Sequence, residues 1–260
     1  MKKQKKIPLV VSIDFDFFIE NDPMLDMGHR EEGIFLNTMW AIRQAEWMAI
    51  RGKTAREMMP MRERPEDFVG QLRALLDIPF GLPAFAAESH AMLPKALDMA
   101  GIARCDIVNF DAHHDIAYGQ CPKNLREKYD CGSWAGHLLD TGRVRNYTQV
   151  YPDWRIVWPE LDKETQLMMA AQWEARFCYW RYFSADLVGG RSVFAKRKLD
   201  IAAVFICRSG CWTPPCYDKD FSLLCRMFGI EPLAERAEPD IVEHMAAIKE
   251  IAEKGSQNGI

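Results

Sequence analysis

Short apolar runs alternate along the chain with segments of helical periodicity. Three runs are largely apolar or β-branched, which is typical of strands that are buried on both faces: Ile7–Ile13, Asp106–Phe110 and Ala202–Cys207. Weaker runs predict further strands at Leu82–Ala87, Arg155–Trp158 and Cys178–Phe183. Segments with helical spacing, several of them with proline at the start or glycine at the end, predict helices at Asn37–Arg51, Pro65–Asp77, Met92–Ala100, Ser133–Asp140, Lys163–Arg176, Asp218–Phe228 and Pro239–Lys254. The charged segment Gly52–Arg64 is interpreted as a loop.

This alternation indicates the α/β class. Continuously apolar strands that alternate with helices favour a mostly parallel sheet with helices on both faces. This arrangement is a three-layer α/β/α sandwich. The length of 260 residues suits one such domain spanning residues 1–260.

Composition narrows the classes of function. Hydrophobic residues make up 48% of the chain and charged residues 27%, so the chain can form a packed core. The net charge of −4 argues against nucleic-acid binding through phosphate contacts. No apolar run reaches the roughly 20 residues that span a bilayer, and the first one stops at Asp14. We therefore expect a soluble, cytoplasmic protein that acts on a small molecule, with no membrane partner, and a homo-oligomer is left open.

The eight cysteines do not form a recognisable zinc motif. C-x-x-C is absent, and the spacing of Cys207, Cys211 and Cys216 matches no zinc finger or ribbon. They are interpreted as reduced, buried thiols.

Ionisable residues gather where the predicted strands end. Asp14 and Asp16 follow the first strand, and His90 follows the second. Asp111, His113 and Asp115 follow the third. Because ligands in open α/β sheets bind beyond the carboxyl ends of the strands, this edge is the expected site. Three further candidates follow later strands: Glu160, Arg208 and Ser209.

The spacing of these residues points to metal binding. Side chains at i and i+2 of an extended chain lie on the same side, roughly 7 Å apart. Extended backbone would therefore bring Asp14 to Asp16, and Asp111 to His113 and Asp115. The four carboxylates carry −4, which two divalent cations balance, and neutral His90 and His113 can complete the ligand shells. Asp and His ligands without thiolate suit Mn²⁺, Fe²⁺ or Zn²⁺, and two such ions can share a hydroxide nucleophile.

Three segments resemble one family. Asp111-Ala-His-His-Asp115 resembles the D-A-H-x-D signature of the arginase/ureohydrolase family, which shares its fold with the histone deacetylases. Ser12-Ile-Asp-Phe-Asp16 resembles the family's S-x-D-x-D segment, and Glu88-Ser-His90 resembles the end of its G-G-D-H stretch. The resemblance implies an arginase-like fold and a dinuclear manganese site. Its six ligands would be Asp14, Asp16, His90, Asp111, His113 and Asp115. The implied reaction is attack of a metal-bound hydroxide on an amide, amidine or guanidine C–N bond.

The chain also departs from that family. The D-x-D segment comes late in arginases and first here, as in a circular permutation. The asparagine that binds an amino-acid substrate, two residues after D-A-H-x-D, is replaced by Ala117. The late glutamate that holds a guanidinium group has no counterpart. The metal centre is therefore expected without the arginine pocket.

Other residues have two interpretations each. His137 and His114 are candidates for moving protons, or are packing residues. Glu160 is a candidate acid/base or a charge at a helix start. Arg208 and Ser209 could bind an anionic substrate group, or Arg208 could pair with a ligand carboxylate.

Two functional alternatives remain. The first is a mononuclear zinc hydrolase that resembles the deacetylases and uses Asp111, His113 and either Asp14 or Asp16. The second is a catalytically silent metal-binding protein of the same fold.

Overall fold

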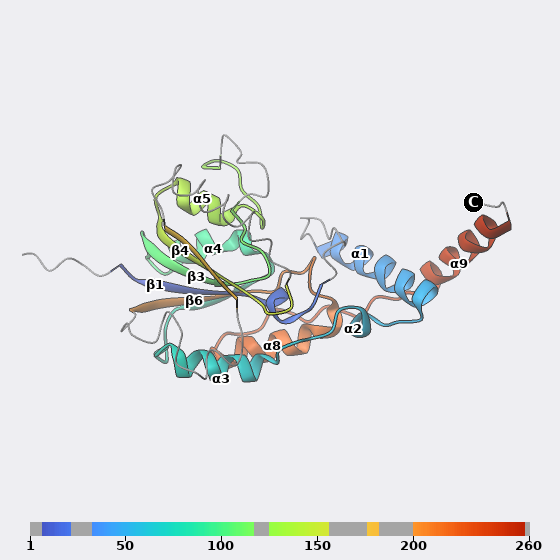
Figure 1. Ribbon diagram of the computed structural model, residues 1–260, viewed down its shortest axis with the longest axis horizontal. Coiled ribbons are helices and arrows are strands. Elements are labelled where there is room, and N and C mark those ends of the chain that lie inside the picture. Colours follow the sequence, from blue (N-terminus) through green and yellow to red (C-terminus); the bar gives the residue numbers. More distant parts are fainter. Residues whose placement is uncertain (1–6, 22–32, 117–124, 156–175, 182–199, 258–260) are drawn as a thin grey trace, which may run out of the picture.

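Six strands form one parallel sheet in the order β2-β6-β1-β3-β4-β5 (Figure 1). The computed structural model describes residues 7–21, 33–116, 125–155, 176–181 and 200–257. The strands in this part of the chain are β1 (Leu9–Asp14), β2 (Ala84–Ala87), β3 (Cys105–Phe110), β4 (Val144–Tyr151), β5 (Arg176–Arg181) and β6 (Ile201–Cys207). All five strand pairings are parallel, so the carboxyl ends of the strands share one edge.

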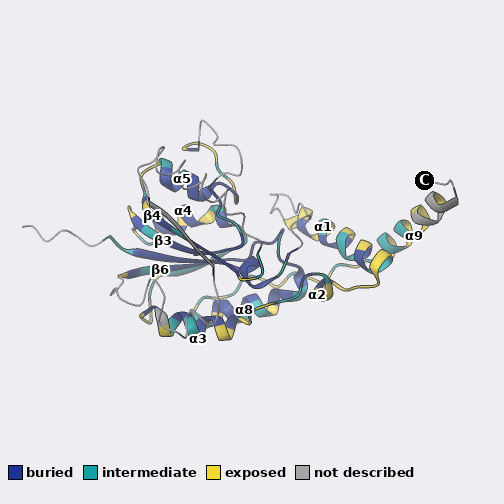
Figure 2. Ribbon diagram, in the orientation of Figure 1, coloured by how far each residue is buried: buried dark blue, intermediate teal, exposed yellow. Residues whose placement is uncertain are grey.

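Helices cover both faces of the sheet (Figures 1 and 2). On one face lie α4 (Leu93–Met99) and α5 (Trp134–Asp140), and on the other α3 (Pro65–Leu75) and α8 (Asp218–Met227). Each face has its own apolar cluster, because successive side chains of a strand point to opposite faces. The predicted three-layer α/β/α sandwich is confirmed.

Strand β1 shows this alternation. Val11 and Ile13 belong to the cluster with α3 and α8, whereas Val10 belongs to the cluster with α4 and α5. All six residues of β1 are buried. The strand lies between β6 and β3 at the centre of the sheet. Its carboxyl end therefore lies in the middle of the edge formed by the carboxyl ends of the strands.

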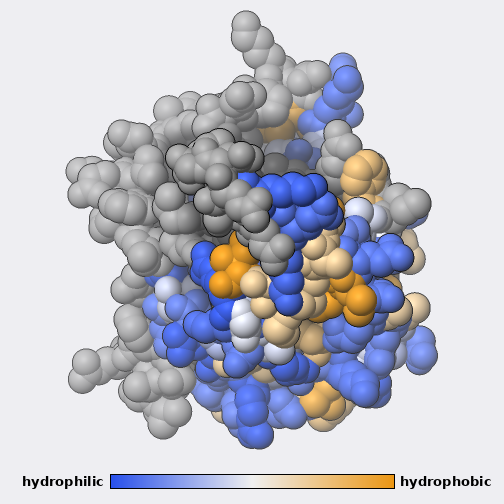
Figure 3. Space-filling view, turned by 90° about the vertical axis from the view of Figure 1, so that its right-hand side faces the viewer, coloured by the Kyte–Doolittle hydropathy of each residue, from blue (hydrophilic) through white to orange (hydrophobic). Residues whose placement is uncertain are grey.

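A pair of helices extends to one side of the sheet. Helix α1 (Gly33–Glu46) continues into a π-helical turn, Trp47–Arg51, which ends at Gly52 with a φ of +64°. Helix α9 (Val242–Gln257) contacts both α1 and this turn. Figure 3 views the molecule from this side and shows apolar residues gathered among hydrophilic ones. The large apolar side chains exposed on these elements are Phe35, Ile42, Ile50, Val242 and Ile251.

The predicted loop Gly52–Arg64 contains a short helix, α2 (Ala55–Met58). Thr54 and Glu57 form a reciprocal capping box at its start. An isolated antiparallel bridge between Ile19 and Met61 ties this segment to the chain that follows β1. No helix in the described ranges is long and apolar enough to cross a membrane.

The structure describes only the first residue of the strand that the sequence predicted before β5. The prediction was Arg155–Trp158; Arg155 lies in a bend, and residues 156–158 lie outside the described ranges. The strand that pairs with β3 is instead β4. The predicted helix Lys163–Arg176 also lies outside these ranges except for Arg176, which begins β5. Strand β4 was missed because polar residues interrupt its apolar pattern, although Gln149 among them is fully buried.

Candidate metal centre

Asp14 and Asp16 stand at the carboxyl end of β1, but the chain between them is not extended as predicted. Asp14 is the last residue of the strand, and Asp16 lies in a 3-10 turn, Phe15–Phe18. The Asp14 carboxylate caps this turn, since its Oδ1 accepts a hydrogen bond from the Asp16 N–H at 3.0 Å. Both side chains are buried.

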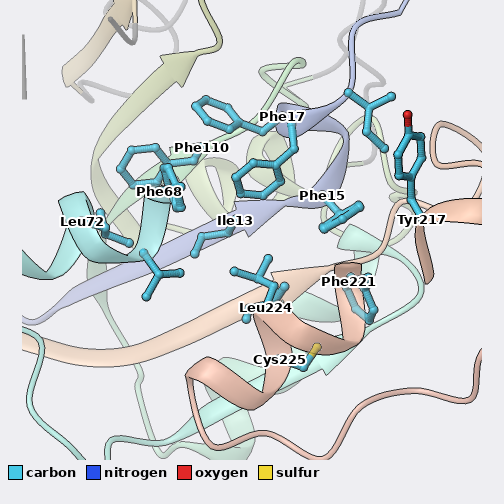
Figure 4. Packing of buried hydrophobic residues seen from close by; sticks show 14 of the residues in the cluster. Ile13, Phe15, Phe17, Phe68, Leu72, Phe110, Tyr217, Phe221, Leu224 and Cys225 are labelled. Atoms are coloured by element: carbon cyan, nitrogen blue, oxygen red, sulfur yellow. The ribbon is translucent and has the colours of Figure 1, made fainter. Parts of the chain in front are cut away.

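The turn is held by phenylalanine packing (Figure 4). Phe17 packs against Phe68 and Phe110, with ring centroids 5.5 and 5.9 Å apart. Phe15 packs edge-on against Phe221 at 5.6 Å. Because apolar neighbours on both sides of Asp16 are fixed in the core, the carboxylate has a defined position.

The residues after β3 also converge through turns rather than through extended backbone. The Asp111 Oδ1 atom accepts a hydrogen bond from the His113 N–H at 2.6 Å. Asp115 has a φ of +51°, in the left-handed region that aspartate tolerates better than most residues. Asp111 and Asp115 are buried, and the His113 side chain keeps 21% of its surface exposed.

His90 lies between three carboxylates. It begins a short 3-10 turn after Ser89, whose hydroxyl caps that turn. His90 Nδ1 is 3.0 Å from Asp14 Oδ2, 3.3 Å from Asp111 Oδ2 and 3.5 Å from Asp115 Oδ2. The structure thus brings the predicted ligands from three separate segments to one point.

The ligand atoms divide into overlapping groups, each with atoms within 4.8 Å of one another. We call His90, Asp111 and Asp115 the inner group, and Asp16, Asp111 and His113 the outer group. They share Asp111, so two ions held by these groups would be close neighbours, as in a dinuclear centre. A third group joins Asp14 and His90 to Cys207, which the sequence analysis treated only as a packing residue.

The charge of this cluster lacks compensation by lysine or arginine. In the described part of the chain, the ion-pair partners of the four aspartates are His90 and His113 alone. Buried carboxylates at such distances repel one another, and a cation would relieve the repulsion. The donor set of carboxylate oxygens and imidazole nitrogens therefore fits Mn²⁺, Fe²⁺ or Zn²⁺.

Burial and neighbouring charges also shift the pKa values of the clustered groups. Burial, reinforced by neighbouring carboxylates, raises the pKa of Asp14 and of Asp115 well above the usual range. Burial opposes charge on Asp111 too, but the hydrogen bonds and charges of His90 and His113 together outweigh it and lower the pKa of Asp111. Burial lowers the pKa of His90, yet hydrogen bonds with Asp111 and Asp14 outweigh it and raise that pKa well above 6.5.

Several residues that the sequence analysis overlooked hold the ligands. Ser12 Oγ lies 2.7 Å from His90 Nε2. The Trp134 Nε1–H donates to Asp115 Oδ2 at 2.7 Å. On the β4 side, the Gln149 amide donates to the Asp111 carbonyl at 2.8 Å, and the Asn109 amide donates to Asp111 Oδ2 at 3.0 Å. Such contacts orient ligands for a metal.

A pocket opens over these ligands. Its lining includes four of the candidate ligands together with residues from two loops: Asp14, His90, His113, Asp115, Cys131, Gly132, Ser209 and Trp212. Ser209, a predicted substrate contact, is thus beside the ligands, whereas Trp212 was not singled out in the sequence. An isolated tryptophan between glycine and proline residues carries no periodic signal that would have identified it.

The two histidines proposed to move protons do not line this pocket. His137 on α5 stacks on Tyr129 at 4.1 Å, and its Nδ1 is hydrogen-bonded to the Leu125 carbonyl at 2.7 Å. His114 Nδ1 accepts from the Ile116 N–H, and burial lowers the pKa of His114 to about 3, so this imidazole is neutral. Glu160 lies outside the described residues.

Arg208 is engaged by the protein itself. It is buried, and its guanidinium bonds Glu88 at 2.6 Å and Asp218 at 2.9 Å. It also donates to the Ala234 carbonyl at 2.8 Å. Glu88 and Asp218 belong to none of the ligand groups, so Arg208 does not pair with a ligand carboxylate as predicted. These pairs engage its guanidinium, which argues against the other predicted role, binding of an anionic substrate.

Comparison of the chain with protein-family models, with curated proteins and with solved structures finds no match. The assignment of a function therefore depends on the chemistry of the site.

Proposed function

We propose that this protein is a metal-dependent hydrolase that cleaves a C–N bond of a small molecule at a dinuclear centre. The observation that supports this most strongly is the pair of Asp/His groups that share Asp111. The resemblance of the ligand segments to the arginase/ureohydrolase signatures suggests an amide, amidine or guanidine as the substrate.

Each part of the site has a role in this proposal. Asp111 would serve both metal positions, His90 and Asp115 would hold the inner ion with Asp14 beside them, and His113 and Asp16 would hold the outer ion. Two manganese ions, or iron or zinc ions, would supply Lewis acidity and an activated water nucleophile when bound. The chain itself excludes bulk water from the inner side, where His90 is 1% exposed. On the outer side, Ser209 and Trp212 shape the space that a substrate would enter.

The described wall of the pocket does not suit a guanidinium side chain of arginine. Its carboxylates are Asp14 and Asp115, and both belong to the ligand cluster. A cationic group would find no further acid there to pair with. This favours a neutral C–N substrate over arginine.

A mononuclear zinc hydrolase is the second candidate. The outer group alone, Asp16, Asp111 and His113, has the Asp/His/Asp composition that the deacetylase-like alternative requires. The two candidates differ in the number of ions bound per chain.

Counting metal ions tests the proposal. Protein is purified without chelator, loaded with Mn²⁺, Fe²⁺ or Zn²⁺ and measured by elemental analysis. We expect two ions per chain in the wild type, none in Asp111→Asn, and one in either His90→Ala or His113→Ala. His244→Ala on α9 is the matched histidine control and keeps both. One zinc ion that is lost in His113→Ala but kept in His90→Ala would favour the mononuclear site, and no metal at all would refute both.

Activity then separates an enzyme from a silent metal-binding protein. The loaded protein is screened against amides, amidines and guanidines for release of amine, ammonia or urea. We expect turnover of at least one class that Asp111→Asn abolishes without loss of fold. Two bound ions with no hydrolysis across the panel would favour the silent protein.

A further inference from the structure

The two histidines of the candidate centre have different surroundings. His90 is enclosed: its ring stacks between Trp134 at 4.5 Å and Phe205 at 5.5 Å, with interplanar angles of 20° and 21°. Its Nε2 contacts Ser12 Oγ at 2.7 Å while its Nδ1 faces Asp14. Two aromatic rings and contacts at both nitrogens thus engage this ring, which is 1% exposed, so its position is fixed before any ion binds.

His113 lies at the wall of the pocket. Its Nδ1 is 2.8 Å from Asp16 Oδ2, and 21% of its side chain is exposed. Its ring packs against Trp212, with centroids 4.4 Å apart and an interplanar angle of 44°. Trp212 lines the same pocket. An aromatic wall on a partly exposed imidazole restricts the ring rotations that would carry Nδ1 away from Asp16.

The loop that carries Trp212 is well anchored. The Trp212 and Thr213 N–H groups both donate to the Ser209 carbonyl, at 2.8 and 2.9 Å. Arg236 donates to the carbonyls of Gly210 and Thr213, at 3.1 and 2.9 Å, and its guanidinium also pairs with Asp218. Trp212 therefore belongs to a turn that is fixed by several hydrogen bonds, so it can hold the neighbouring His113 ring in place.

Gly210 allows this turn to pack closely against its neighbours because glycine has no side chain. A Cβ at Gly210 would lie 2.1 Å from Glu88 Oε1 and 2.7 Å from Leu36 Cδ1. The turn therefore packs directly on Glu88, which pairs with Arg208.

We propose that the two metal positions are inequivalent, and that Trp212 is the positioning residue that sets the occupancy of the outer one by holding His113. This inference rests on the proposed metal centre. The inner position, built on the enclosed His90, fills first and exchanges slowly. The outer position, built on His113, whose side chain keeps 21% of its surface exposed, fills second and exchanges readily.

Titration of the metal-free protein with Mn²⁺ tests this inference. Calorimetry gives the two affinities, and electron paramagnetic resonance distinguishes an isolated Mn²⁺ ion from a spin-coupled pair. The variants are Trp212→Ala, Trp212→Leu and Trp212→Phe. Apo unfolding temperatures show that each variant is folded. Leucine restores bulk without an aromatic face, and phenylalanine restores the ring.

We expect two unequal affinities in the wild type. Trp212→Ala and Trp212→Leu should leave the tighter one within about twofold and weaken the other by about 10- to 100-fold, the usual effect of removing a residue that orients a ligand. At two Mn²⁺ per chain these variants show the isolated-ion spectrum, and the coupled spectrum returns at higher Mn²⁺. Trp212→Phe should recover most of the second affinity.

The results that overturn the inference differ from those that overturn the proposed function. Coupled pairs with wild-type affinities in both Trp212→Ala and Trp212→Leu would show that the tryptophan does not position His113. Equal weakening of both ions would show that it acts on the fold as a whole. A wild-type protein that binds no Mn²⁺, Fe²⁺ or Zn²⁺ would refute the proposed centre itself.

Discussion

Replacing Asp115 by asparagine isolates the charge of one ligand from its structural role. Asparagine has the same shape and tolerates the left-handed backbone at this position, where φ is +51°. Its side-chain oxygen can still accept the hydrogen bond that Trp134 Nε1–H donates at 2.7 Å. The substitution therefore removes an ionisable carboxyl group and a metal ligand while the packing stays in place.

In the metal-free protein, Asp115→Asn should not destabilise the fold. Burial raises the pKa of Asp115, so the folded chain holds a proton at pH values where the unfolded chain has released it. A carboxyl of this kind lowers stability as the pH rises above its unfolded pKa of about 3.9. Asparagine avoids this penalty, and we expect the apo variant to unfold at the same temperature as the apo wild type or higher at pH 7.

With metal present we expect the opposite order, so that the wild type unfolds at a higher temperature than Asp115→Asn. An ion at about one hundred times its dissociation constant stabilises the folded state by about 2.7 kcal/mol per site. For a chain of 260 residues this raises the unfolding temperature by roughly 5 to 10 °C per site. The wild type, with two groups of ligands, should gain from both sites, and Asp115→Asn should lose the contribution of the inner one.

The assay is thermal unfolding with chelator and with Mn²⁺. Asp106→Asn is the matched control, because Asp106 pairs with Arg145 at 2.9 Å and belongs to none of the ligand groups. The reasoning is refuted if Asp115→Asn gains as much from Mn²⁺ as the wild type does. It is also refuted if the apo variant unfolds several degrees lower, since the carboxylate would then stabilise the metal-free fold.

Three further predictions concern the supports of the site. Gly136→Ala would place a Cβ 2.4 Å from the Ile116 carbonyl oxygen, and we expect urea unfolding to show a loss of about 1 to 3 kcal/mol. Gly70→Ala, with nothing within 4 Å, should be neutral or gain up to about 1 kcal/mol. Asp218→Asn removes the buried carboxylate that pairs with both Arg208 and Arg236 and should cost about 3 to 5 kcal/mol, whereas a small loss would show that these two pairs do not stabilise the fold. Because ligation requires deprotonated carboxylates, Mn²⁺ affinity measured by calorimetry should rise from pH 6 to pH 8, and a flat profile would argue against the aspartate ligands.

Much of the fold could be predicted because its strands obey simple patterns. The runs around β1, β3 and β6 are continuous and apolar, which is the pattern of strands buried on both faces. The rule that sites lie at the carboxyl ends of parallel strands then placed Asp14, Asp111 and their neighbours together without any tertiary information. The structure brings these residues to one point, as that rule predicts.

The path by which the ligands converge could not be predicted in the same way. The sequence analysis assumed extended backbone, whereas Asp16 lies in a 3-10 turn and Asp115 has a left-handed φ. Both turns involve aspartate side chains that bind backbone N–H groups, at Asp16 and at His113. Spacing in the sequence reports which residues are near one another, but these local hydrogen bonds decide the backbone geometry.

Strand β4 shows that a buried polar residue in one strand can help to predict the strand beside it. Asn109 lies in the middle of the apolar strand β3 and is fully buried, so its amide requires partners from a neighbouring strand. Gln149 is its register partner on β4, and Tyr147 supplies a hydroxyl 3.0 Å from the same amide. A strand that carries polar residues is therefore expected beside β3, and Val144–Tyr151 contains several of them. Gln149, one of the polar residues that hid β4 from a hydrophobicity pattern, also holds Asp111, because a ligand buried in a sheet needs polar support from the strand next to it.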